Sequence, residues 1–233
     1  MTVFTFHLAA SSPPATVRTL MRPPGASTTP GLLHAECMTP MTLGSPVFSP
    51  RRIQLRKLAV FAAWESEAAV DAFLDSPGLG RRLADGWHVR LDFMRRWGSV
   101  TELPSLPEAV GEQDPDLPVV AVTLARLKHP QIPRFIKWGK PVERLVRDHP
   151  GQTLALAAAR PVRTVSTFSV WKTQQDMIDM VGGHSDIPDP RRHADAMIER
   201  NRKDFHFEFT TLRFRVRSEH GAWEGRTGIV PTI

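Results

Sequence analysis

Cysteine is almost absent from this chain, which has Cys37 alone among 233 residues. A single thiol can neither close an intrachain disulfide nor build a thiolate metal cluster, and it favours a reducing compartment. Runs of eighteen apolar residues are also absent, as is a basic N-terminal segment followed by an apolar stretch. These absences argue against a membrane span and a signal peptide. We therefore expect a folded, cytoplasmic protein.

Several catalytic and binding signatures are missing as well. Gly182-Gly183-His184 lacks the Gly-Lys-Ser/Thr of a phosphate-binding loop, no nucleophile elbow is found, and no two histidines have H-x-x-x-H spacing. The 30 Lys and Arg residues exceed the 24 Asp and Glu residues, but they are scattered along the chain. A nucleic-acid partner is therefore not expected, whereas a transient attraction to acidic lipid headgroups stays open.

The chain carries the same predicted order of elements twice. Apolar and β-branched runs predict strands, and apolar residues three and four positions apart predict helices. Residues 1–102 are a first half, with strands at 3–9, 32–38, 55–64 and 87–97 and helices at 15–21 and 65–74, the latter followed by a further turn to 83. Residues 119–233 are a second half, with strands at 119–127, 153–159, 165–171 and 210–217 and helices at 132–147, 174–181 and 191–203. Residues 103–118 are rich in proline and acidic residues without periodicity, which is typical of a linker.

Short sequence segments also match between the two halves. Phe61-Ala62-Ala63-Trp64 matches Phe168-Ser169-Val170-Trp171, and Arg96-Trp97 matches Arg213-Phe214. This similarity predicts a tandem duplication of a β-α-β-β-α-β unit, the ferredoxin-like pattern with helices on one face of a four-stranded antiparallel sheet. Two such sheets that pack with their open faces together form a closed barrel. We therefore predict an α+β fold, a pseudo-dimeric α+β barrel that encloses an apolar space for a small ligand or a flat cofactor.

One helix of the second half carries the candidate ligand of a cofactor. His193, Met197, Arg200 and Asp204 share a face of the predicted helix, and the first half has Ser76 in the place of His193. Neutral histidine is a common ligand of haem iron, and the cations nearby can pair with haem propionates: Arg191, Arg192, Arg200 and Lys203. Alternatively, His193 is a helix cap or a surface residue.

Two tryptophans are further candidates for the walls of a cofactor site. Trp138 lies on the apolar stripe of the predicted helix at 132–147, and Trp171 ends the strand at 165–171. Large aromatic side chains at such positions either line a cavity or belong to the ordinary core.

Several sequence segments of the second half resemble those of one enzyme family. The segments Thr167-Phe168-Ser169-Val170-Trp171, His193-Ala194-Asp195-Ala196-Met197-Ile198-Glu199-Arg200 and Leu212-Arg213-Phe214-Arg215-Val216 are similar to, and in the same order as, those of the spheroidene monooxygenase family. The resemblance implies an oxygenase that uses haem, within the broader class of haem-binding dimeric α+β barrels. Relatives in that class take an axial histidine from a helix of the C-terminal half, the place that His193 occupies. The loop before His193 is longer than the family pattern and contains His184, which is a rival ligand.

These observations predict a haem-dependent monooxygenase that oxidises an apolar small molecule with electrons from an unknown donor. Its haem b site would comprise His193, Met197, Arg200, Trp138 and Trp171. One alternative is a haem-dependent dehydratase or peroxidase of the same barrel class, because a fold does not fix a reaction. Another is a non-enzymatic barrel that shelters a lipophilic ligand, and further assembly into a homo-oligomer stays open.

Overall fold

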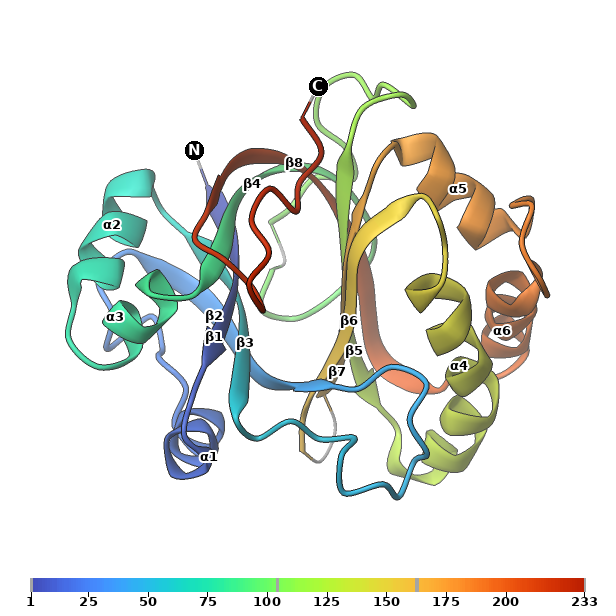
Figure 1. Cartoon of the computed structure of the whole chain (residues 1–233), viewed down its shortest axis with the longest axis horizontal. Coiled ribbons are helices and arrows are strands. Elements are labelled where there is room, and N and C mark those ends of the chain that lie inside the picture. Colours follow the sequence, from blue (N-terminus) through green and yellow to red (C-terminus); the bar gives the residue numbers. More distant parts are fainter. Residues whose placement is uncertain (1, 104, 162–163, 233) are drawn as a thin grey trace.

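The chain forms a closed antiparallel barrel with helices on two opposite flanks (Figure 1). The computed structural model describes residues 2–103, 105–161 and 164–232. The first half contributes β1 (Val3–Ala10), α1 (Pro13–Met21), β2 (Leu32–Met41), β3 (Lys57–Trp64), α2 (Glu67–Asp75), α3 (Leu79–Ala84) and β4 (Trp87–Ser99). The second half contributes β5 (Val119–Leu127), a 3₁₀ turn (His129–Gln131), α4 (Ile132–Arg147), β6 (Gln152–Arg160), β7 (Thr164–Trp171), α5 (Gln174–Gly182), α6 (Arg192–Arg202) and β8 (His206–His220).

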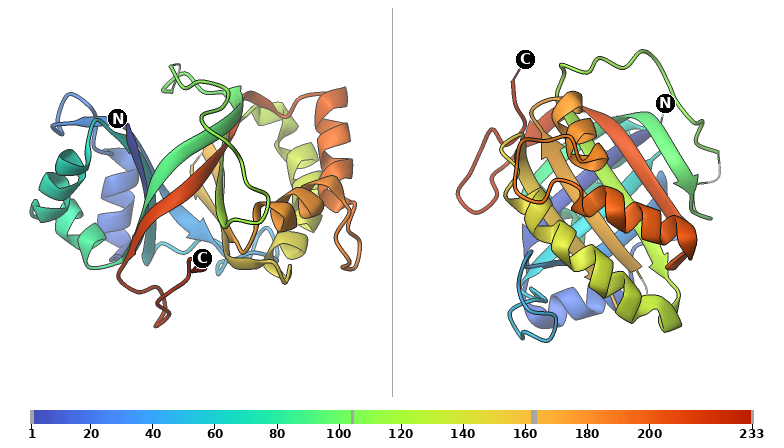
Figure 2. Two further views of the ribbon diagram at one scale, coloured as in Figure 1. Left: turned by 90° about the horizontal axis from the view of Figure 1, so that it is seen from above. Right: turned by 90° about the vertical axis from the view of Figure 1, so that its right-hand side faces the viewer.

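The strand order is that of two ferredoxin-like sheets joined at their edges. One sheet has the order β4-β1-β3-β2 and the other β6-β7-β5-β8, and the pairs β2–β6 and β4–β8 close the barrel. The β4–β8 junction is long, from His88 opposite His220 to Ser99 opposite Phe209, whereas β2 and β6 pair only from Thr39 to Met41. Figure 2 shows the two helical flanks on either side of the barrel. The predicted fold class is confirmed, while the duplication and the division at residues 103–118 stay predictions.

Local sequence signals explain where several helices begin. Ser66 caps α2 by accepting a hydrogen bond from the Ala69 amide, and Thr173 caps α5 by accepting one from the Asp176 amide. Pro133 lies in the first turn of α4, where its missing N–H removes no helical hydrogen bond. Among the described residues, no helix is long and apolar enough to cross a membrane.

The barrel interior is filled with aromatic side chains. Phe6 and Phe168 stack with ring centroids 3.8 Å apart, and Phe4, Phe61 and Phe214 contact one another in the same core. All five are at most 1% exposed, so no water-sized space adjoins them. An eight-stranded barrel is wide enough either for its own side chains or for one small ligand, and here side chains fill the interior at these residues. The apolar space that the sequence predicts inside the barrel is therefore filled by the protein's own side chains at these residues, while the barrel that shelters a lipophilic ligand stays a prediction.

Both ends of the filled interior are closed by polar contacts. The Glu219 carboxylate accepts hydrogen bonds from the Trp87 indole and the Ile229 amide, which draws the C-terminal tail over one opening. Elsewhere the interior holds Glu36, whose carboxylate lies 3.1 Å from Arg160 and 3.2 Å from Arg126. Burial raises the pKa of Glu36, while the two guanidinium groups oppose that rise. The interior thus leaves no exposed apolar opening at these residues.

The helices of the first half pack tightly on their sheet. Val60, Ala62 and Trp64 of β3 and Val70 and Leu83 of the covering helices form one buried cluster. A Cβ added at Gly80 in α3 would lie 1.9 Å from the Phe73 carbonyl oxygen, so the backbones are already in contact there.

Two expectations about element boundaries need correction. Ser76 is the C-cap of α2, so it is not the counterpart of His193, which is the second residue of α6. β8 begins at His206 rather than at Thr210, because His206, Glu208 and Phe209 pair with β5, with a register shift at Phe207. Asp204 lies beyond the end of α6 and is not part of its helical face.

Candidate functional site

Two helices of the second half, α4 and α6, bury few side chains, whereas α5 packs against the sheet through Met177 and Met180. All residues of α6 are described and none is buried, and α4 buries only Leu145 among its residues. Beneath these helices, Thr167 in the middle of β7 is exposed although β5 and β6 flank it on both sides. Solvent therefore reaches the outer face of a central strand, which means that open space separates the sheet from α4 and α6.

Small side chains form the floor of this space. On the outer face, Thr123 of β5, Thr167 of β7 and Ala157 of β6 lie side by side in register. Ala121 and Ala155 continue the floor toward the end where Trp171 lies, and they are half-buried. Ala121 also packs against the cluster of Leu145 and Met177, so the helices meet the floor at that end, and its other side chains are short.

His193 is held by a hydrogen bond that fixes its tautomer. Its Nδ1 lies 3.2 Å from the carbonyl oxygen of Val181, the residue before the last of α5. A carbonyl oxygen only accepts hydrogen bonds, so Nδ1 carries the proton and Nε2 keeps a free lone pair. Burial lowers the pKa of His193, although the bond to Val181 opposes that effect, so the ring is neutral at pH 7. The geometry prepares Nε2 to act as a ligand or a base.

Arg200, on the same face of α6, reaches down to the sheet. Its guanidinium lies 3.9 Å from the ring of Phe209 on β8 and pairs with Asp204 at 3.6 Å. Met197 lies between His193 and Arg200 on that face and is half-buried. The predicted triplet therefore spans the space from the end of α5 to the start of β8.

The two candidate tryptophans differ in their surroundings. Trp171 is fully buried, packs with Met177 and Met180 of α5, and donates its indole N–H to the Ser169 hydroxyl at 2.8 Å. It forms one end wall of the space and is also part of the core. Trp138 lies on α4, half-buried and outside every buried cluster of the described residues. Its stripe is the one that faces the sheet, because Leu145 further along it packs near Trp171.

The rival ligand lies on the surface. His184 is exposed in the loop between α5 and α6, and its ring lies beside Gly182. No histidine, cysteine or carboxylate set of three or more among the described residues is close enough to hold a metal ion. A metal held here would therefore need a prosthetic group to supply its other ligands.

Arg213, on the outer face of β8, is a functional candidate that sequence reasoning missed. Its guanidinium lies 4.3 Å from the centre of the Trp97 ring, and it is not ion-paired to any acidic residue in the described part of the chain. Burial, with a smaller contribution from Arg95, lowers the pKa of Arg213 to about 10. The sequence shows arginine at every second position from Arg213 to Arg217, and nothing in that alternation singles out Arg213. An unpaired, half-buried cation beside the floor can stabilise negative charge there.

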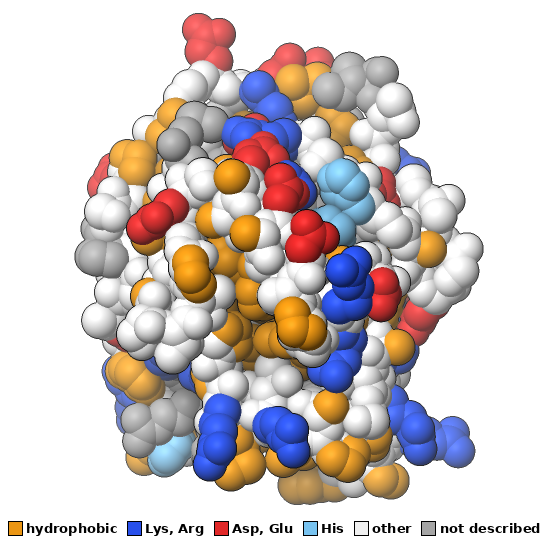
Figure 3. All heavy atoms as spheres, turned by 90° about the vertical axis from the view of Figure 1, so that its left-hand side faces the viewer, with side chains coloured by type: hydrophobic (Ala, Val, Ile, Leu, Met, Phe, Trp, Pro, Cys, Tyr) orange, Lys and Arg blue, Asp and Glu red, His pale blue; other side chains and the backbone are white. Residues whose placement is uncertain are grey.

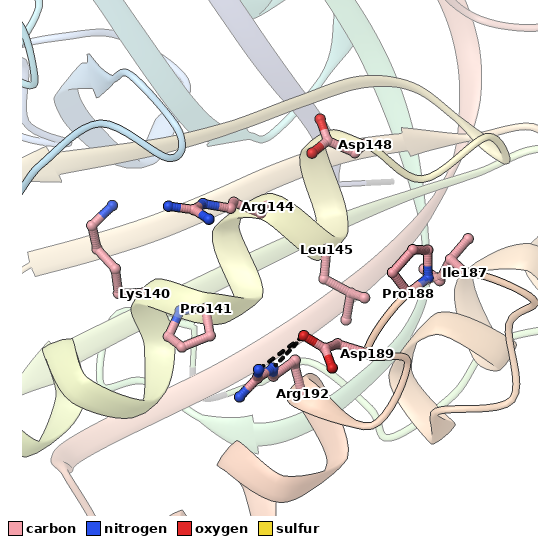
Figure 4. A pocket seen from close by; sticks show the side chains of 9 residues that line it. All are labelled: Lys140, Pro141, Arg144, Leu145, Asp148, Ile187, Pro188, Asp189 and Arg192. Carbon is pink, nitrogen blue, oxygen red and sulfur yellow. Dashed lines mark hydrogen bonds and ion pairs between the residues drawn. The ribbon is translucent and has the colours of Figure 1, made fainter.

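A cleft of about 510 Å³ lies at the other side of α6, between α4 and the segment that leads into this helix (Figure 4). Leu145 of α4 faces Pro188 and Ile187 across it, and Arg192 pairs with Asp189 at 2.8 Å. Lys140 and Arg144 add two more cations along α4. The cleft adjoins His193 in sequence and offers positive charge for carboxylates.

The fold and one relative connect this site to known proteins. No family model matches the chain. The chain is 28% identical over 186 residues to spheroidene monooxygenase of Rhodobacter capsulatus, a match that covers 76% of this chain and 74% of that protein. A crystal structure of aldoxime dehydratase with butyraldoxime shares the fold at 10% identity and a TM-score of 0.55, over 92% of this chain and 79% of that one. A second aldoxime dehydratase structure has 10% identity and a TM-score of 0.51, over 92% and 81% of the two chains. The chain is therefore an enzyme of the oxidoreductase class by homology, and its resemblance to spheroidene monooxygenase, predicted from its strand and helix motifs, is confirmed.

Proposed function

We propose that this protein is a haem-dependent monooxygenase that oxidises an apolar small molecule, and that His193 would hold the iron. The observation that carries the proposal is the bond from Nδ1 of His193 to the Val181 carbonyl. Histidines that bind metals donate their other ring N–H to such an acceptor, which fixes the ring and raises its basicity. The relative named as a monooxygenase supports the reaction class.

The space between sheet and helices fits a flat macrocycle. Its floor of alanine and threonine leaves room that larger side chains would fill, as they do in the first half. Trp138, Trp171 and Met197 supply apolar walls, and Arg200 supplies a cation for a propionate. Arg144 of the cleft is a further cation for a carboxylate at the edge of the site, whereas Lys140 and Arg192 are paired with Glu143 and Asp189.

When bound, haem supplies the activation of dioxygen, with electrons from a separate donor. The protein contributes the rest. His193 keeps a neutral imidazole because burial disfavours its charged form, and the Val181 carbonyl prevents the ring from rotating. Arg213 offers a positive charge on the sheet side, and the apolar walls limit the access of water.

The haem ligand is tested by a matched pair of alanine variants. The protein, produced with a haem precursor, is expected to bind one haem and to show a Soret band. His193→Ala should lose both, whereas His184→Ala, the exposed histidine of the same loop region, should keep them. Loss in His184→Ala with retention in His193→Ala would transfer the ligand role, and retention in both would contradict the site.

The reaction class is tested by oxygen uptake with an apolar substrate. Uptake should require a reductant, because a monooxygenase reduces the second oxygen atom to water. Turnover of a peroxide or of an aldoxime without any electron source would instead identify the dehydratase or peroxidase alternative.

A further inference from the structure

The first quarter of the chain has a one-sided charge. Residues 1–64 contain six cationic side chains but Glu36 as their single acidic residue, and Glu36 is only 1% exposed. Whatever surface these residues present is therefore positive. The six cations are Arg18, Arg22, Arg51, Arg52, Arg56 and Lys57.

Exposed apolar side chains accompany these cations. Phe48, in the loop between β2 and β3, is 99% exposed, and Met21 at the end of α1 is 77% exposed. Val17, one turn before Met21, is also exposed. A phenylalanine with almost its whole surface in water is costly, and such residues commonly mark a place of contact. None of the exposed residues in this part of the chain is acidic. We name the following set the basic apolar surface: Val17, Arg18, Met21, Arg22, Phe48, Arg51 and Arg56.

The members of the basic apolar surface lie at one end of the molecule. In Figures 1 and 2, α1 and the loop of residues 42–56 both lie at the lower end. The Ser11 amide donates a hydrogen bond to the Arg56 carbonyl at 2.9 Å, which ties the two segments together. In Figure 3 the lowest part of the visible face shows hydrophobic and basic side chains without acidic ones.

The loop that carries Phe48 is anchored at its base. Arg52 pairs with Glu143 of α4, and the same carboxylate accepts the Gly44 amide at 2.9 Å. The other cations point away from such partners: Arg18, Arg22, Arg51 and Arg56 form no ion pair with any acidic residue that the structure describes. These four unpaired cations are exposed, two at α1 and two in the loop that carries Phe48.

We propose that the basic apolar surface binds a lipid bilayer with anionic headgroups. Phe48 and Met21 enter the interfacial region, while the four arginines contact the headgroups. The chemistry fits a bilayer better than a protein, because the apolar side chains protrude singly among cations instead of forming a hollow. This docking is independent of the haem site. If the proposed function holds, it places the enzyme where apolar substrates dissolve.

The test is co-sedimentation of the full chain with vesicles of phosphatidylcholine, with or without phosphatidylglycerol. We expect binding only to the anionic vesicles, with weakening in high salt. Phe48→Ser should bind about tenfold more weakly. Arg51→Gln should cost about fivefold, because each cation near an anionic surface contributes a similar amount.

Matched controls lie elsewhere on the molecule. Ile198→Ser removes an exposed apolar side chain of α6, and Arg81→Gln removes an exposed cation of α3, so both should bind like the wild type. Equal binding of neutral and anionic vesicles, or equal losses in control and test variants, would overturn the proposal. So would a Phe48→Ser variant that dissociates a dimer in sedimentation velocity yet binds vesicles unchanged, since a second copy would then be the partner. Haem content is measured on the same samples, and its loss leaves the outcome unaffected.

Discussion

Replacement of Arg213 by methionine is expected to make the protein more stable and less active. The guanidinium is half-buried on the outer face of β8, without an acidic partner among the described residues, and its pKa is lowered from 12.5 to about 10. Such a shift means that the folded state disfavours the charge. Methionine has a similar length and no charge, so it keeps the packing and removes the penalty.

The magnitude follows from the pKa. A fall of this size corresponds to about 3 kcal/mol at about 1.36 kcal/mol per pKa unit. Partial exposure reduces this by about half through solvent screening. Loss of the contact between Arg213 and the Trp97 ring lowers the free energy of unfolding by about 0.5 kcal/mol. The net expectation is a gain of about 1 kcal/mol in the free energy of unfolding, or about 2 to 4 °C in Tm for a chain of this size.

Urea denaturation of the haem-free protein measures this gain. Arg217→Met is the matched control on the same strand, because Arg217 pairs with Glu67 and Asp92 and its loss should destabilise. Oxygen uptake by the haem-loaded protein should fall in Arg213→Met and be partly restored in Arg213→Lys. A destabilised Arg213→Met variant would refute the reasoning, since the arginine would then be structural.

Three further predictions concern space and protonation. Thr167→Trp should abolish stoichiometric haem binding, read from the Soret band, with an unfolding free energy close to that of the wild type, because the side chain is exposed; retention of haem would refute the assigned space. Gly80→Ala should lower the unfolding free energy by about 3 kcal/mol, because its Cβ would lie 1.9 Å from a backbone oxygen. Burial lowers the pKa of His88 to about 4, so the unfolded chain binds its proton first as pH falls. Above pH 6.5 His88 is neutral in both the folded and the unfolded state, and its contribution to stability is fully present. Between pH 6.5 and pH 4 the free energy of unfolding falls by about 3 kcal/mol, because only the unfolded chain binds the proton. In urea titrations, His88→Gln should therefore have a flatter pH profile than the wild type.

Much of the fold was accessible from periodicity alone. The helix at 132–147 was predicted with its observed ends, since the stripe from Phe135 to Leu145 is unbroken and Pro133 marks its start. β5 was likewise predicted over the observed residues. The start of β8 was missed because Asp204 to Phe209 mixes charged and aromatic residues. The alternation of buried His206 with exposed Phe207 becomes readable only once its partner strand is known.

The location of the site was harder to predict than its ligand candidate. His193 was selected from spacing and resemblance, but the space beside it was assigned to the barrel interior. Six large aromatic side chains are buried in that interior, and their volume can be counted only once the strand directions are known. The actual space depends on how far α4 and α6 stand from the sheet, and no local pattern specifies that distance. The four alanines among residues 155–159 are the available signal, and their pattern by itself predicts only a strand.

Ion pairs and hydrogen bonds, together with the packing of Leu145 near Trp171, hold the two helices over this space. Arg134 of α4 pairs with Glu199 of α6 at 2.5 Å and also donates to the Lys203 carbonyl, so the helices are fastened to each other. Glu143 of α4 is fastened to Arg52 in the loop of the first half. Most buried apolar side chains belong to the barrel interior and to the cluster of the first half. As a result, α4 and α6 have few apolar side chains that pack on the sheet. The open space is thus a consequence of where the chain places its apolar side chains, and the same placement leaves the Nε2 atom of His193 without a competing partner in the described structure.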